Sequence, residues 1–252
     1  MSTVALPLGP AATGATALRV LTQLRRDPRT VALLLLVPAL LMTLLRYVFD
    51  GQPETFDRVG APLIGLFPFI TMFLVTSITM LRERTGGTLE RLMSMPIAKL
   101  DLLTGYGLAF AAVAAVQAGI TAGVAFLALG LDVEGSAVAV VALAVANAVL
   151  GMSLGLFVSA FASSEFQAVQ FMPAFVLPQL ILCGLFVPRE EMAEALEVAS
   201  YALPLTYAFD ALQRVASGTD FGSRGWADVA VVVGVTLLAL ALGALTLRRR
   251  TP

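Results

Sequence analysis

Six long apolar runs constrain the fold of this 252-residue chain more than any other feature. Each is close to or above the length of about 20 residues at which an α-helix crosses a hydrocarbon core about 30 Å thick. The composition agrees, because 58% of the residues are hydrophobic and 13% are charged, whereas about a quarter are charged in a typical soluble domain. We expect an all-α membrane protein with six transmembrane helices. The predicted spans are residues 31–49, 61–81, 102–129, 136–161, 168–187 and 226–247.

The content of reactive residues limits the chemistry that this chain can perform. It has no histidine and one cysteine, Cys183, so an internal disulfide and a metal site of imidazoles or several thiolates are excluded. Residues 1–18 lack the pattern of a signal peptide, and we expect the first span to insert uncleaved. The sequence also lacks the phosphate-binding loop G-x-x-x-x-G-K-[ST]. We therefore expect no catalytic residues, no metal and no bound cofactor.

Basic residues are distributed unequally between the two sides of the predicted bundle. The side that would hold both termini carries 11 of the 16 basic residues, and the opposite side carries 12 of the 17 acidic residues. Lys and Arg concentrate in cytoplasmic segments of membrane proteins. The distribution therefore predicts that both termini, and the short basic tail at 248–252, lie in the cytoplasm.

The segment 1–30 precedes the predicted transmembrane domain, 31–247, and contains an amphipathic pattern that Pro28 stops. Arg19, Gln23 and Arg26 fall away from its apolar stripe. This pattern is typical of a helix that lies in the membrane interface with its arginines toward lipid headgroups, although a solvated surface helix is an alternative. The apolar stripe consists of Ala17, Leu18, Leu21 and Leu24.

A short charged segment, residues 82–96, separates the second and third spans and has the pattern of a small helix. The glycine pair at 86–87 interrupts the preceding helix, Thr88 can cap a new one, and Pro96 ends it. Glu90 lies in the first turn, where the helix dipole favours negative charge. The apolar residues of this helix share one side: Leu89, Leu92 and Met93. We interpret the segment as a docking element, the alternative being an anchor at the headgroups.

The predicted outer loop, residues 188–228, is long and partly apolar. Its glutamates, Glu190 to Glu197, line one side of a short helical pattern that Pro204 breaks. A second short helix is expected at 206–216, with Gly218 as its C-cap. Helices too short to span a membrane persist at membrane depth only where protein or water satisfies their backbones.

Residues 151–155 match G-x-S-x-G, which is a signature of serine hydrolases. A serine nucleophile needs a neighbouring base, and this chain has no histidine and no lysine within a span. We therefore interpret Gly151 and Gly155 as a small-residue surface for close helix packing, with Gly119 and Gly123 as a second candidate. The polar residues in or near the spans are expected to face protein or a cavity, where contact with a substrate is an alternative to hydrogen bonding between helices: Gln117, Asn147, Gln167, Gln170 and Gln179.

These motifs, in this order and spacing, resemble the permease subunits of ABC transporters of the ABC-2 type, especially daunorubicin-resistance-like drug exporters. The cytoplasmic segment resembles the coupling helix of that family, and the late motifs resemble the end of its fifth span and a re-entrant helical hairpin on the extracellular side. The resemblance covers essentially the whole chain. The motifs are residues 82–84, 87–92 and 96, then 178–179, 184–188 and 203–207 with Asp210.

The resemblance implies a half-transporter in a bacterial plasma membrane, paired with a second permease and driven by separate cytoplasmic ATPase subunits that hold ATP and Mg²⁺. Membrane lipids and a hydrophobic small molecule complete the expected partners, and no nucleic acid is among them. Leu89 and Leu92 are the expected apolar anchors on the ATPase. The full sets implied are Glu83, Thr88, Leu89, Glu90, Arg91 and Leu92 for coupling, and Pro204, Tyr207 and Asp210 for the hairpin.

The substrate class that the resemblance implies is amphipathic small molecules such as drugs or antibiotics. Export of a lipid or lipid-linked glycan stays an alternative, because the sequence does not reveal the transport cavity. A membrane sensor coupled to an ATPase is a third possibility from a different functional class.

Overall fold

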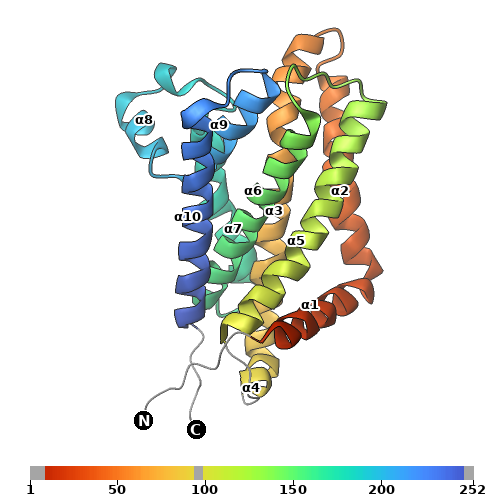
Figure 1. Cartoon of the computed structure of the whole chain (residues 1–252), viewed down its shortest axis with the longest axis vertical. Helices are drawn as coiled ribbons and strands as arrows, with labels where there is room; N and C mark the ends of the chain where they lie inside the picture. The colour runs from red at the N-terminus through yellow and green to blue at the C-terminus, as the bar shows by residue number, and fades with distance from the viewer. Residues whose placement is uncertain (1–8, 94–98, 247–252) are drawn as a thin grey trace.

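The computed structural model describes residues 9–93 and 99–246, and these residues form helices without any β-strand (Figure 1). The α-helices are α1 (Pro10–Arg25), α2 (Pro28–Val48), α3 (Pro53–Thr85), α4 (Thr88–Met93), α5 (Lys99–Gly123), α6 (Ala137–Val158), α7 (Glu165–Leu182), α8 (Glu194–Ser200), α9 (Pro204–Ala216) and α10 (Gly222–Thr246). A π-helical turn, Val124–Ala128, prolongs α5, and short 3-10 helices lie at Ser159–Phe161 and Arg189–Glu191.

Within the described residues, five helices are long and apolar enough to cross a membrane: α2, α3, α5 with its π-helical extension, α6 and α10. The predicted fifth span corresponds to α7, which has 18 residues and packs against α3 in the same bundle (Figure 1). α7 carries Glu165, three glutamines and two prolines, and it is not among those five helices. A multi-pass membrane protein is therefore supported, whereas the count of six spans stays a prediction.

Two helices differ in extent from the predicted spans. The second was predicted at 61–81, but α3 covers 33 residues and extends well beyond both ends of that range. The fifth was predicted to reach residue 187, but α7 ends at Leu182. Gly184 adopts φ +103°, a left-handed conformation that a helix cannot contain.

Local sequence explains where several helices begin. Proline occupies the start of α1, α2, α3 and α9, where its missing N–H is not needed. Pro204 therefore begins a helix in addition to ending the preceding pattern. Side-chain oxygens of Asp27, Ser136 and Ser164 accept the free backbone N–H groups at the starts of α2, α6 and α7.

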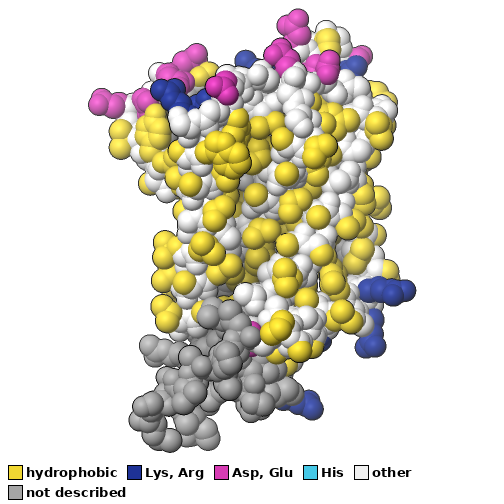
Figure 2. All heavy atoms as spheres, in the orientation of Figure 1, with side chains coloured by type: hydrophobic (Ala, Val, Ile, Leu, Met, Phe, Trp, Pro, Cys, Tyr) yellow, Lys and Arg dark blue, Asp and Glu magenta, His cyan; other side chains and the backbone are white. Residues whose placement is uncertain are grey.

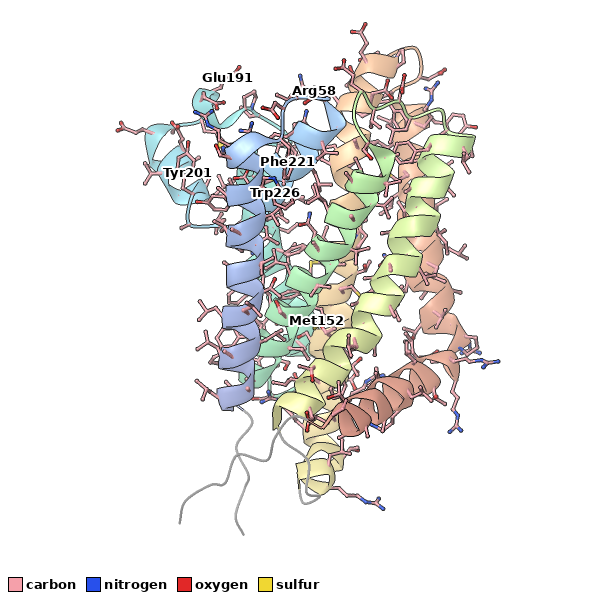
Figure 3. All side chains as sticks on the ribbon, viewed as in Figure 1. Arg58, Met152, Glu191, Tyr201, Phe221 and Trp226 are labelled. Carbon is pink, nitrogen blue, oxygen red and sulfur yellow. The ribbon has the colours of Figure 1, made fainter. Side chains whose placement is uncertain are left out.

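The centre of the bundle is the packing of α3 against α6, which is more extensive than any other helix pair among the described residues. Large buried side chains surround this pair, among them Phe69, Phe73, Tyr106 and Met152, and Met152 lies within the bundle in Figure 3. Helices α5, α7, α9 and α10 pack around α3 and α6.

Charged side chains concentrate at the two ends of the molecule. Helices α1, α4 and the last turn of α10 lie at one end, which we call the α4 end, and α8 and α9 lie near the other, the α8 end (Figure 1). Figure 2 shows most acidic side chains at the α8 end, where some basic side chains accompany them, further basic side chains toward the α4 end, and a largely uncharged band between the two ends. The predicted separation of charges is therefore present in three dimensions.

Candidate functional site

The α4 end contains the predicted coupling segment. α3 ends at Thr85, where the N–H of Gly86 still donates to the Arg82 carbonyl oxygen at 2.8 Å. Gly87 has φ +71°, which turns the chain into α4. Thr88 is the first residue of α4, and the Gly87 carbonyl oxygen accepts the N–H of Arg91 at 3.1 Å. The predicted cap at Thr88 is therefore wrong by one residue.

The predicted coupling residues are placed in different environments. The side chains of Thr88 and Arg91 are exposed. Leu92 is half-buried and packs against the chain's own hydrophobic core, and its role as an anchor on an ATPase stays a prediction. The side chains of Leu89 and Glu90 lie outside the described part of the structure, as does Pro96 as a whole.

Glu83 differs most from its predicted role as a contact for a partner. Its side chain is only 4% exposed and forms an ion pair with Arg19 of α1, with 2.8 Å between Oε1 and Nη1. Arg19 also donates to the Tyr106 hydroxyl at 2.7 Å, so three helices meet at this cluster. Within the described residues, Glu83 Oε2 has no hydrogen-bond partner. Glu83 therefore fixes α1 to α3 within the chain.

A second group of contacts fixes α1 to α5. The buried carboxylate of Asp101 accepts the N–H of Gly9 at 3.0 Å and the hydroxyl of Thr13 at 3.3 Å. Thr16 packs directly on Gly105, where a Cβ atom would clash with it. These contacts explain why α1 lies across the α4 end of the bundle against α5 (Figure 1).

The predicted orientation of the amphipathic segment is only partly right. Ala17 and Leu21 of its apolar stripe pack against the core, but Leu18 is 70% exposed. Arg19, expected to point toward lipid headgroups, instead turns into the bundle because Glu83 and Tyr106 provide partners there.

Further polar contacts join the end of α3 to the later helices. Arg82 donates two hydrogen bonds to the carboxylate of Glu165 at the start of α7, at 2.8 and 2.9 Å. Arg84 donates to the Thr246 hydroxyl in the last turn of α10 at 3.3 Å. The last turn of α3 is thus connected to α1, α7 and α10.

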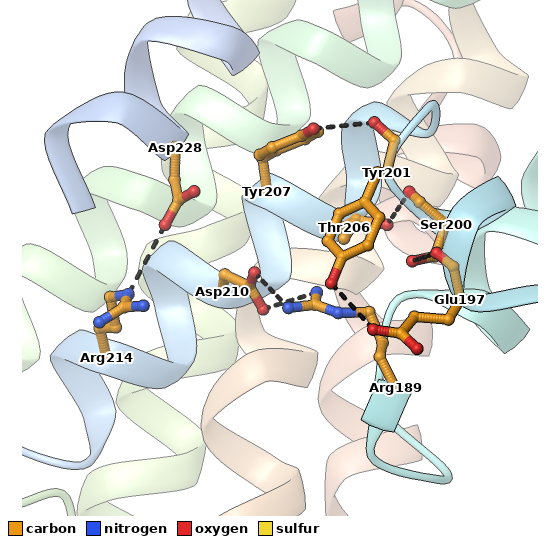
Figure 4. A network of polar contacts seen from close by, with 9 residues as sticks. All are labelled: Arg189, Glu197, Ser200, Tyr201, Thr206, Tyr207, Asp210, Arg214 and Asp228. Carbon is orange, nitrogen blue, oxygen red and sulfur yellow. Dashed lines mark hydrogen bonds and ion pairs between the residues drawn. The ribbon is translucent and has the colours of Figure 1, made fainter. Parts of the chain in front are cut away.

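The α8 end has its own polar network, drawn in Figure 4. Arg189 donates to both carboxylate oxygens of Asp210 at 2.9 and 2.8 Å and lies over the Tyr201 ring at 5.6 Å. Burial alone would lower the pKa of Arg189, but the hydrogen bonds and charge of Asp210 outweigh it and raise that pKa. The Tyr207 hydroxyl donates to the Tyr201 carbonyl oxygen at 2.8 Å.

These contacts hold α8 and the preceding 3-10 helix against α9. Pro204 begins α9 and Tyr207 and Asp210 lie on it, so the structure brings the three predicted hairpin residues onto one helix. Whether α8 and α9 enter the membrane as a re-entrant hairpin stays a prediction. A T-shaped contact between Phe221 and Trp226, with 5.4 Å between ring centroids, lies where α10 begins (Figure 3).

The structure places Gly151 and Gly155 where α6 touches the backbone of α3. A Cβ atom at these positions would clash with the carbonyl oxygens of Phe69 and Phe73. Ser153 is buried, and its hydroxyl donates to the Leu150 carbonyl oxygen of its own helix at 2.8 Å. The second candidate pair behaves differently, because a Cβ at Gly119 or Gly123 would meet no atom within 4 Å.

The polar residues of the spans follow the prediction in some cases. Gln117 and Thr71 exchange hydrogen bonds between α5 and α3 at 2.8 and 3.0 Å. Gln179 accepts the N–H of Leu205 at 3.4 Å, connecting α7 to α9. Gln170 of α7, in contrast, is exposed.

Sequence reasoning missed the structural roles of Arg19, Tyr106 and Asp101. An available signal was the position of Glu83 and Asp101 beside apolar runs, where a carboxylate needs a partner. The helical face of Arg19 alone did not indicate the pairing. In the described ranges, no group of three or more His, Cys, Asp or Glu side chains is placed to hold a metal ion.

Comparisons with known proteins show which sequences this chain is similar to. ABC transporter G family members 20 and 23 of Dictyostelium discoideum are 26% and 27% identical over 167 and 152 residues, or 66% and 60% of this chain. The probable multidrug ABC transporter permease YbhR of Escherichia coli K12 is 26% identical over 153 residues, or 61% of this chain.

The matched segments span only 23%, 22% and 42% of those three relatives, respectively. A family model described as ABC-2 type transporter matches residues 12–216, which include nearly all of α1 and the whole of α2 to α9. Because this match covers most of the chain, the chain belongs to the ABC-2 type family of ABC transporter membrane proteins.

Proposed function

We propose that this chain is the membrane subunit of an ATP-driven exporter of amphipathic small molecules. Two permeases enclose the pathway, and cytoplasmic ATPase subunits bind ATP and Mg²⁺ and move α4. In this proposal the chain lies in a bacterial plasma membrane, and its α4 end faces the cytoplasm. Family membership supports the class of function. The substrate class is supported by the name of YbhR, a probable multidrug permease.

The observation that carries the proposal is the continuity between α4 and α3. Two glycines join α4 to α3, whose 33 residues correspond to about 50 Å of helix. α3 packs against α6, α7 and α9 on its way to the α8 end. A displacement of α4 therefore reaches the opposite end of the bundle through one element. Alternating access needs two such arrangements with different contacts.

Arg19 and Glu83 add α1 to the moving unit. Their ion pair and the Tyr106 hydroxyl connect α1, α3 and α5 immediately above the glycine junction. The Glu83 carboxylate moves with the last turn of α3, and its contact with Arg19, which also donates to Tyr106, carries α1 and α5 along. An ATPase that pushes on α4 therefore moves an assembly of three helices.

The surface of α7 is suited to contact with a second permease or with an aqueous pathway. Gln170, Pro173 and Pro178 are all exposed on this helix. Each proline lacks an N–H, so the carbonyl oxygens of Val169 and Ala174, four residues earlier, lack their helical hydrogen bonds. Exposed polar groups of this kind are unfavourable in hydrocarbon. This face therefore suits contact with protein or water better than contact with lipid.

Single substitutions in α4 that introduce a negative charge test the proposal. We expect Arg91→Glu, and independently Leu89→Asp, to insert normally but to lose co-purification with the candidate ATPase and export of a fluorescent amphipathic dye from cells. Arg224→Glu is the matched control, because Arg224 is exposed at the opposite end. Full export and ATPase binding by both α4 variants would refute the assignment.

A further inference from the structure

A cavity of about 220 Å³ lies where α1 meets α2, and side chains of α3 and α5 form its other walls. It is distinct from the α4 surface and from the Arg19–Glu83 ion pair. Its walls include Leu24 of α1, Thr30 of α2, Ile78 of α3 and Phe110 of α5. The cavity is therefore formed only because α1 folds across the α4 end.

The cavity changes from polar to apolar along α3. Arg82 lies at its charged end, and Thr79, Ile78 and Val75 follow in order toward the interior of the bundle. Seven residues of helix separate Arg82 from Val75, which corresponds to about 10 Å. Phe110 adds to the apolar wall. The gradient matches a molecule with a polar head and an apolar tail that enters along the membrane normal.

The polar rim contains both signs of charge. Asp27 and Arg82 line the same cavity and interact electrostatically. The pKa of Asp27 is lowered by hydrogen bonds from the Thr30 side chain and backbone, so its carboxylate is ionised at neutral pH. Arg82 is also paired with Glu165, which contributes a second carboxylate near this rim. Two carboxylates and one guanidinium disfavour a purely anionic head.

We propose that this cavity binds a zwitterionic phospholipid from the leaflet at the α4 end, with its phosphate toward Arg82 and its ammonium toward Asp27. The acyl chains start between Ile78 and Phe110 and continue into the bilayer. The cavity is smaller than the roughly 300–1,000 Å³ pockets that enclose drug-sized ligands, so it holds a head group and the first methylenes only. The bound lipid supports the corner between α1 and α2.

This inference needs only a membrane-spanning bundle and does not rest on the proposed transport function. It is tested on the purified full chain without any ATPase. The chain is equilibrated with vesicles of phosphatidylethanolamine and phosphatidylglycerol in equal amounts and with identical acyl chains. Lipids retained after mild detergent extraction are then counted by native mass spectrometry. We expect phosphatidylethanolamine to be retained in excess.

Two variants locate the site. Asp27→Asn keeps the N-cap of α2, because asparagine caps as well as aspartate, but removes the charge. It should lower the preference for phosphatidylethanolamine about 1.4- to fivefold, which corresponds to the contribution of one exposed ion pair. Ile78→Trp fills the cavity and should abolish retention of this lipid. The matched controls are Asp50→Asn, at an exposed carboxylate near the α8 end, and Val233→Trp, at an exposed position of α10.

The expected pattern is loss of preference in Asp27→Asn, loss of binding in Ile78→Trp and parental behaviour of both controls. Equal retention of the two lipids, a preference for phosphatidylglycerol, or parental binding by Asp27→Asn would each overturn the proposal. If Ile78→Trp does not fold, the comparison between Asp27→Asn and Asp50→Asn still decides it.

Discussion

Removing the guanidinium of Arg19 should release α1 from the bundle more often. Arg19→Leu leaves the Glu83 carboxylate, which is 4% exposed, without its cationic partner. It also removes the hydrogen bond to Tyr106. We expect α1 to stay docked for most of the time, because Asp101 and the contact of Thr16 with Gly105 are unchanged. The fraction of time that α1 is detached should rise.

The size of the effect follows from the burial of the ion pair. Breaking a fully buried pair by removing one partner costs about 3–5 kcal/mol. The Arg19 side chain is 31% exposed, so solvent recovers part of this cost, and we expect about 2–3 kcal/mol. With about 1.4 kcal/mol for each factor of ten, the detached population should increase about 30- to 140-fold.

Labelling of a thiol on the buried side of α1 measures the population in which α1 is detached. Thr16 lies on the side of α1 that packs against Gly105 of α5, and it is 6% exposed. A cysteine in its place, Thr16→Cys, therefore reacts with a maleimide only when α1 detaches. The native Cys183 is replaced by alanine, which leaves a single thiol. The rate of labelling, followed by mass spectrometry, should rise by the factor given above in Arg19→Leu. Arg25→Leu, which removes an exposed arginine of the same helix, should leave the rate unchanged.

A double variant that removes both charges of the ion pair provides the decisive comparison. In Arg19→Leu with Glu83→Leu, no buried carboxylate remains unpaired, and buried pairs can be replaced by apolar residues at little cost. Labelling should therefore return toward the parental rate. Parental labelling in Arg19→Leu alone, or equal acceleration in the double variant, would refute the role of the ion pair.

Two further predictions, each with a control variant, follow from the packing and from the α8 end. Gly151→Leu should lower the thermal midpoint of the purified chain, because overpacking against the α3 backbone costs about 1–3 kcal/mol or more. Gly119→Leu should keep the parental midpoint, because the added side chain has space there. Asp210→Asn should accelerate trypsin cleavage after Arg189 about 5- to 150-fold, because the half-buried guanidinium loses its charged acceptor at about 1–3 kcal/mol. Asp220→Asn, at an exposed carboxylate beyond α9, should be cleaved at the parental rate.

Much of the helical layout could be predicted from the sequence. Runs of apolar residues have to form helices in a membrane, since only helices satisfy every backbone group within one segment. The glycine pair before α4 and the Gly151–Gly155 surface were also visible, because glycine marks turns and close packing by its missing side chain. The exact ends were less visible, as the 33 residues of α3 show.

The partners of charged residues could not be predicted in the same way. Glu83 was assigned to an external contact because its segment resembles the coupling helix of the family, whereas the fold places it beneath α1. Leu92 was assigned to a partner surface but packs against the chain's own core. A helical pattern shows which residues share a face, but it does not show what lies opposite that face.

The sequence by itself determined that this chain is a helical membrane protein of the ABC-2 type with its charges separated between two ends, because segment length, hydropathy and motif spacing are properties of the chain itself. Only the tertiary structure decided that Arg19 turns inward to Glu83, that Asp101 holds the start of α1, and that Asp27 and Arg82 share a cavity. The physical reason is that these contacts join residues more than 50 positions apart, and their distances depend on how the helices pack.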